Sequence, residues 1–99
     1  MTREEITAVL LQRADALRAI GATSLYMFGS RARGDNRPDS DLDLFIEYKQ
    51  QPKRVSLLDI IAFENDIQDA IGIPVHMTTR DSLHPIIKVL VEKDAIQLF

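Results

Sequence analysis

Residues 29–44 read GSRARGDNRPDSDLDL, a glycine–serine step into a basic, glycine-broken loop that ends in two aspartates one residue apart. Residues two apart in a β-strand point to the same face, so Asp41 and Asp43 at a strand start would present their carboxylates together. Mg²⁺ prefers oxygen ligands and completes its shell with water and substrate phosphates. Gly29 allows a phosphate to approach the backbone, and Ser30 offers an N–H and a hydroxyl at an expected helix start. The stretch therefore outlines a site for a metal-bound nucleoside triphosphate.

The sequence on either side of this stretch predicts alternating helices and strands. Thr2 and Glu5 form a capping box at the start of a helix, and Gly21 is a typical helix end. The expected elements in chain order are a helix over residues 2–20, strands over residues 23–28 and 42–48, a helix over residues 56–71, a strand over residues 73–78, a helix over residues 86–92 and a strand over residues 95–99. This order predicts an α/β sheet with helices packed on one side.

Alternation along residues 42–48 divides the expected sheet into two faces. The positions that we expect to face the helices are Leu42, Leu44 and Ile46. The alternate positions, expected on the face without helices, are Asp41, Asp43, Phe45 and Glu47. In the later strand His76 alternates with Val75 and Met77, so we expect His76 to share the open face with the two aspartates. The apolar stripe expected on the second long helix consists of Leu57, Ile60, Ile61, Ile67 and Ile71.

Length and composition narrow the class of protein. The 99 residues are expected to form one domain, residues 1–99, with a single core. The formal net charge of −3 argues against binding nucleic acid by charge alone, although Arg31, Arg33 and Arg37 make one loop basic. The absence of cysteine excludes a disulfide framework and a thiol nucleophile. A charged amino terminus and the lack of a membrane-length apolar run predict a cytoplasmic protein without a membrane partner.

Four motifs of the sequence occur in a fixed order, and they are Gly29-Ser30, Ala32-Arg33-Gly34, SDLDL over residues 40–44 and TRDSLHP over residues 79–85. Together they resemble the minimal nucleotidyltransferases of the DNA polymerase β superfamily. The resemblance spans nearly the whole chain and implies a two-layer α/β (α+β) nucleotidyltransferase fold, with a mixed β-sheet and helices packed on one face. Such chains are similar to the small bacterial partners of HEPN-domain proteins, which are often encoded as toxin–antitoxin pairs. Active members transfer AMP from ATP to a tyrosine of the HEPN toxin and silence it.

The resemblance also implies roles for individual residues. Gly29 and Ser30 match the nucleotide-binding pair that contacts phosphate, and Arg33 lies inside the adjoining motif as a further candidate phosphate contact. Asp41 and Asp43 match the first two catalytic carboxylates, which bind Mg²⁺ or Mn²⁺. The remaining loop arginines, expected to be solvated, are Arg31 and Arg37.

His76 stands where the family carries a third catalytic carboxylate. A neutral imidazole is a softer ligand than a carboxylate, so it would weaken Mg²⁺ binding there and slow transfer. Alternatively, His76 could act as a general base or favour Mn²⁺ over Mg²⁺. It could also be only a polar residue on an exposed strand. The sequence leaves these alternatives open.

Two classes of function follow. In the first, the chain is an enzyme that uses Mg²⁺–ATP to transfer AMP to a hydroxyl of a HEPN-type toxin and thereby acts as an antitoxin. In the second, it is a catalytically weakened or inactive antitoxin that binds nucleotide and neutralises its partner by forming a complex. Free RNA or DNA as the substrate has less support because the chain lacks a basic face. The nucleotide preference, the acceptor and the oligomeric state stay open.

Overall fold

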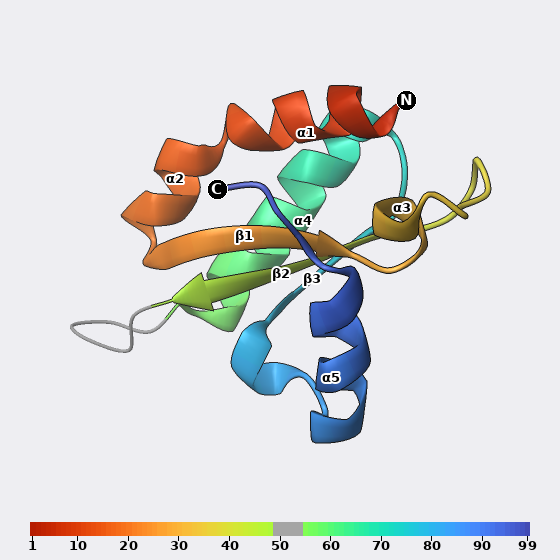
Figure 1. The fold of residues 1–99 in the computed structure, drawn as a ribbon. Helices are drawn as coiled ribbons and strands as arrows, with labels where there is room; N and C mark the ends of the chain where they lie inside the picture. Colours follow the sequence, from red (N-terminus) through yellow and green to blue (C-terminus); the bar gives the residue numbers. More distant parts are fainter. Residues whose placement is uncertain (49–54) are drawn as a thin grey trace.

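The computed structural model describes residues 1–48 and 55–99, which form helices packed on a four-stranded sheet (Figure 1). The elements in chain order are α1 (Arg3–Leu11), α2 (Ala14–Ala19), β1 (Ala22–Phe28), α3 (Ser30–Arg33), β2 (Leu42–Tyr48), α4 (Leu57–Ile71), β3 (Val75–Thr79), the 3₁₀ turn η1 (Arg80–Ser82), α5 (Pro85–Asp94) and β4 (Ile96–Gln97). The predicted capping box is present, with the Thr2 hydroxyl accepting from the Glu5 N–H. Ser56 caps α4 by accepting from the Asp59 N–H, and Pro85 occupies the first turn of α5.

The sheet has the strand order β3-β2-β1-β4. Strand β1 is antiparallel to both β2 and β4, whereas β2 and β3 are parallel. The predicted mixed sheet is thus confirmed. Helices α1, α2 and α4 lie on one side of it, and α5 stands apart from them (Figure 1).

The core lies between the sheet and these three helices. The fully buried residues of β2 that face it are those predicted from alternation, Leu42, Leu44 and Ile46. Ile6 and Leu10 of α1 and Ile67 of α4 pack into the same cluster. Burying an apolar side chain of this size stabilises the fold by roughly 1.5–3 kcal/mol. Because alternate residues of β2 are held in this core, its charged residues must lie on the opposite face of the sheet.

Two details of the helices differ from the sequence prediction. The first helix is broken at Gln12 and Arg13 into α1 and α2. At the break Arg13 donates from Nη1 to the Val9 carbonyl and pairs through Nε with Asp66 of α4 at 2.5 Å, so its side chain links the break to α4. The apolar stripe of α4 is also narrower than predicted. Leu57 and Ile61 are exposed because only the side of α4 that carries Ile60, Ile67 and Ile71 turns inward.

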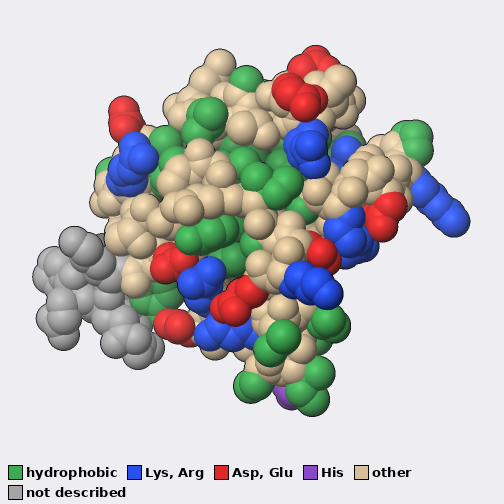
Figure 2. Space-filling view, viewed as in Figure 1, with side chains coloured by type: hydrophobic (Ala, Val, Ile, Leu, Met, Phe, Trp, Pro, Cys, Tyr) green, Lys and Arg blue, Asp and Glu red, His purple; other side chains and the backbone are tan. Residues whose placement is uncertain are grey.

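Helix α5 exposes an unusual number of large apolar side chains. The residues that form this α5 patch, with their exposed fractions, are Ile86 (74%), Ile87 (53%), Val89 (70%) and Leu90 (62%). Figure 2 shows green side chains gathered over α5 at the lower edge of the molecule. Val91 is the buried residue of this helix. Apolar surface of this kind commonly marks a protein contact.

Within residues 1–48 and 55–99, every helix is too short or too polar to cross a membrane.

Candidate functional site

The turn between β1 and α3 depends on glycine at position 29. Gly29 has φ +76° and ψ −158°, a conformation that L side chains rarely adopt. A Cβ at this position would also lie 2.5 Å from Oδ2 of Asp43, which is closer than a carbon and an oxygen can approach. Ser30 follows directly as the first residue of α3. The absence of a side chain at Gly29 therefore lets the Asp43 carboxylate pack directly against the turn.

The sheet register places three residues of the site side by side. Phe28 of β1 pairs with Asp43 of β2, and Asp43 pairs in turn with His76 of β3. We call this set the Phe28–Asp43–His76 row. Asp41 lies at the entrance to β2, one residue before the strand begins. The prediction that His76 shares a face with the two aspartates is confirmed.

His76 contacts the first aspartate rather than its register neighbour. Its Nε2 lies 3.0 Å from Oδ2 of Asp41. Both side chains are well exposed, 67% for His76 and 47% for Asp41. Burial raises the pKa of the Asp43 carboxyl, a positive charge on His76 opposes this rise, and the Asp41 carboxylate adds to it. The two aspartates thus differ in environment, with Asp43 the more enclosed.

Arg33 is held by carboxylates of this chain. Its Nε lies 3.1 Å from Oδ2 of Asp35, and its Nη1 lies 3.3 Å from Oδ2 of Asp94 at the end of α5. These hydrogen bonds raise the pKa of Arg33. These two carboxylates compete with a phosphate for the guanidinium.

Arg31 has a structural place that the sequence prediction missed. We expected it to be solvated, but it is buried and donates to the carbonyl of Ser40 from Nε (3.0 Å) and Nη2 (2.9 Å) and to that of Pro38 from Nη2 (3.2 Å). It therefore fixes the end of the loop just before Asp41. Arg37 is exposed, as predicted.

The face expected to be open is partly closed by an aromatic layer. Phe45 points to that face but is fully buried, stacked on Tyr26 with ring centroids 4.6 Å apart and tilted against Phe28 at 5.6 Å. The Arg80 guanidinium lies over the rings of Tyr26 and Phe45, 5.2 and 5.4 Å from their centroids. Side chains rather than a helix thus cover this part of the sheet.

Arg80 is itself anchored to two elements. It pairs with Glu47 of β2 at 3.0 Å and with Glu92 of α5 at 3.8 Å. Sequence reasoning did not single out Arg80. The available signal was its place in the TRDSLHP motif, residues 79–85.

The donor set suits a divalent cation that takes further ligands from a substrate. Asp41 and Asp43 offer hard oxygen donors, and the Asp43 carboxylate lies directly against the Gly29 turn. In the part of the chain that the structure describes, no three His, Cys, Asp or Glu side chains gather into a metal-binding group. The residues thus fit a cation shared with phosphate oxygens better than a structural metal.

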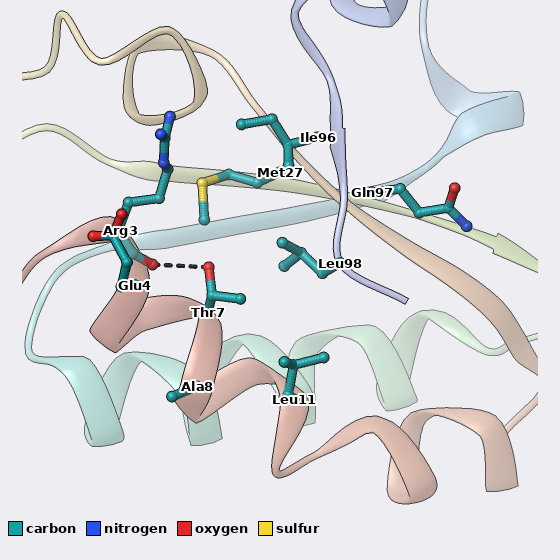
Figure 3. Close-up of a pocket in the computed structure, with 9 residues that line it drawn as sticks. All are labelled: Arg3, Glu4, Thr7, Ala8, Leu11, Met27, Ile96, Gln97 and Leu98. Atoms are coloured by element: carbon teal, nitrogen blue, oxygen red, sulfur yellow. Dashed lines mark hydrogen bonds between the residues drawn. The ribbon is translucent and has the colours of Figure 1, made fainter.

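A separate groove of about 370 Å³ lies between α1, β1 and β4 (Figure 3). Its walls are mainly apolar and include Ala8, Leu11 and Leu98. Near its rim the Thr7 hydroxyl donates to the Arg3 carbonyl at 2.8 Å. The groove contains none of the candidate site residues, and the chemistry of the aspartate site does not depend on it.

A family model and individual relatives of this chain agree with one another on the kind of protein that it resembles. The family described as "Nucleotidyltransferase domain" matches residues 10–97. A candidate protein adenylyltransferase of Methanocaldococcus jannaschii is 38% identical over 76 residues, covering 76% of this chain and 74% of the relative. The protein adenylyltransferase MntA of Thermococcus cleftensis is 32% identical over 84 residues, covering 84% of this chain and 82% of the relative.

Solved structures share the fold. The structure of a candidate minimal nucleotidyltransferase superposes with a TM-score of 0.80 at 29% identity, covering 97% of this chain and 95% of the other. A structure of a tri-AMPylated Shewanella oneidensis HEPN toxin in complex with its MNT antitoxin matches with a TM-score of 0.70 at 14% identity, covering 97% of this chain and 71% of the other. At 14% identity the second match shows a shared fold alone.

Proposed function

Because this chain belongs to the nucleotidyltransferase domain family, we propose that it transfers AMP from ATP to a hydroxyl group of a partner protein. The observation that carries the proposal is the meeting of Asp41, Asp43 and the Gly29 turn at one end of the two central strands, where β1 ends and β2 begins. Phosphoryl and nucleotidyl transfer depend mainly on positioning and on charge stabilisation, so a small chain that holds a triphosphate and a cation has the main parts that the reaction needs.

The residues would divide the work as follows. Gly29 and Ser30 would contact the triphosphate, with the Ser30 hydroxyl and backbone N–H as donors. Asp41 and Asp43 would hold Mg²⁺ or Mn²⁺. Such a cation neutralises the triphosphate and lowers the pKa of the attacking hydroxyl. Arg33 would exchange a carboxylate partner for a phosphate oxygen.

His76 supports a second candidate function. Its hydrogen bond to Asp41 engages one carboxylate oxygen that the cation would otherwise use. An imidazole also brings no negative charge to the position where the family has a third carboxylate. We therefore propose slow transfer with Mg²⁺. The alternative is an antitoxin that binds nucleotide without turnover and acts by covering its partner.

Several observations support a protein acceptor, and we propose a HEPN-type toxin. Relatives more than 30% identical are named protein adenylyltransferases. The fold neighbour from Shewanella oneidensis is an antitoxin bound to an AMPylated HEPN toxin. On this chain the α5 patch offers apolar surface of the kind that proteins bury in a complex.

The test is a transfer assay with the purified chain, ATP labelled on its α-phosphate, Mg²⁺ or Mn²⁺, and the HEPN-type protein encoded nearest to its gene. We expect label and the mass of at least one AMP on the partner. The matched control replaces both Asp41 and Asp43 by asparagine, which keeps side-chain size and removes the charge. ATP binding that is equally metal-dependent in this double variant would overturn the metal assignment. A stable complex that gains no label would select the non-catalytic antitoxin.

A further inference from the structure

Phe28 occupies a position beside the two aspartates that the proposed roles do not use. It is the last residue of β1, directly before Gly29, and the sheet register sets it opposite Asp43. Side chains of directly opposed residues in an antiparallel pair have Cβ atoms roughly 4.5–5.5 Å apart. The Phe28 ring is therefore a neighbour of the more enclosed carboxylate.

The Phe28 ring packs against another aromatic ring on one side and is only partly covered. Phe28 contacts Phe45, which is fully buried, stacked on Tyr26 and covered by Arg80. Phe28 itself is half-buried. An aromatic ring that is fixed on one side and accessible on another can stack with a planar group at little conformational cost.

We propose that Phe28 stacks against the nucleobase of the bound nucleoside triphosphate, an inference that rests on the proposed function. Phe28 belongs to the strand that leads into the phosphate-binding turn. In an in-line displacement the attacking hydroxyl approaches opposite the leaving pyrophosphate. With the pyrophosphate at the Gly29–Ser30 turn on the β1 side, the acceptor comes from the β3 side, where His76 lies. Phe28 therefore lies on the side of Asp43 that faces the bound triphosphate rather than the acceptor, and it is the aromatic residue directly adjoining the phosphate-binding turn.

Stacking of this kind sets a particular specificity. Every base has a π-face, so a stacking ring retains bases without reading their hydrogen-bonding edges. Phe28 then favours nucleoside triphosphates over inorganic triphosphate and purines over pyrimidines, while contributing little to the choice between ATP and GTP.

The experiment compares calorimetric binding of Mg²⁺–ATP and Mg²⁺–triphosphate to the natural chain and to Phe28→Leu. We expect Phe28→Leu to weaken ATP binding by roughly tenfold, within the range for base–aromatic stacking, and to leave triphosphate binding unchanged. The matched control is Phe63→Leu, because Phe63 is also half-buried but packs on the helical face of the sheet. This control should leave both affinities unchanged.

A second variant gives a direct optical signal. The natural chain contains no tryptophan, so Phe28→Trp introduces a single indole at the proposed stacking position. We expect ATP and GTP to quench its fluorescence and inorganic triphosphate to leave it unchanged. The same variant should bind ATP at least as tightly as the natural chain, which separates a stacking role from a merely structural one.

The outcomes separate this inference from the proposed function. Unchanged ATP affinity in Phe28→Leu, or an equal loss for ATP and triphosphate, overturns the stacking role. A defect in transfer to the partner with normal ATP binding also overturns it and assigns the ring to the acceptor. Conversely, selective loss of ATP binding in Phe28→Leu, in a chain that never labels a partner, supports the stacking role while the proposed transfer activity fails.

Discussion

Nε2 of His76 lies 3.0 Å from Oδ2 of Asp41, although the sheet register sets His76 beside Asp43. The imidazole thus reaches along the strand direction to the more exposed of the two carboxylates. Asp43 is left between the Gly29 turn on one side and the aromatic layer on the other. The two aspartates of one motif therefore have different partners, and they should respond differently to pH and to substitution.

The raised pKa of Asp43 predicts a pH-dependent stability in the absence of divalent cations. Burial sets the folded-state pKa above 3.8, its ordinary value, so the folded protein holds this proton more tightly than the unfolded chain does. The resulting stabilisation is fully present below pH 3.8 and is lost as the pH rises through the folded-state pKa. Urea unfolding across this range should show Asp43→Asn gaining stability relative to the natural chain as the pH rises. A difference between the two proteins that is constant with pH would contradict the prediction.

Replacing His76 by aspartate should accelerate transfer with Mg²⁺. The change restores a negative oxygen ligand in the Phe28–Asp43–His76 row and releases Asp41 from its hydrogen bond. A tenfold rise in the transfer rate requires only about 1.4 kcal/mol of transition-state stabilisation. Single-turnover measurements with Mg²⁺ and with Mn²⁺ check this. The control is His76→Ala. If the natural chain transfers AMP rapidly and the alanine variant does not, the imidazole is a ligand or general base rather than a weakening substitution.

Removing the α5 carboxylate that holds Arg33 should tighten nucleotide binding. Asp94→Asn takes away one of the two charges that compete with phosphate for the guanidinium. Because the pair is solvent-exposed and such pairs contribute about 0.2–1 kcal/mol, the gain in Mg²⁺–ATP affinity should reach at most about fivefold. Calorimetry measures it, with Asp15→Asn as the matched control, since Asp15 pairs with Arg18 on α2. Weaker ATP binding in Asp94→Asn would show that Arg33 needs this anchor.

A charge on the α5 patch should disrupt the complex with the partner. Leu90→Asp places a carboxylate at a 62% exposed position of α5 and should weaken binding to the HEPN-type protein by at least tenfold. Leu58→Asp is the matched control, because Leu58 is 78% exposed on α4 and lies outside the patch. Size-exclusion chromatography with light scattering, followed by titration, measures the complex. Equal binding by both variants would place the partner elsewhere.

The sequence predicts well those features of the site that depend on residues close together in the chain. Alternation along β2 correctly placed Leu42 and Leu44 in the core and Asp43 on the other face, because side-chain direction in a strand depends only on position parity. The capping box at Thr2 and the start of α4 at Ser56 were equally local and equally correct.

Contacts between residues far apart in the sequence could not be predicted in this way. The Arg33–Asp94 pair joins residues 61 apart, and Arg13 at the helix break pairs with Asp66 of another helix. The burial of Arg31 depends on how the loop turns its carbonyls, which no spacing rule describes. Phe45 was expected on an uncovered face, but Arg80 and two aromatic neighbours reach over it.

The antiparallel pairing of β1 and β2 also has a consequence for folding kinetics. Gly29, Ser30, Arg33, Asp41 and Asp43 all lie within residues 22–48, which form two adjacent strands and their connection. Contacts between residues close in sequence form early, because little loop-closure entropy opposes them. His76 joins the site only when β3 pairs in parallel with β2. That pairing closes a longer loop, because α4 lies between the two strands in the sequence. Substitutions at His76 should therefore alter the unfolding rate more than the folding rate, whereas those around Gly29 should slow folding itself.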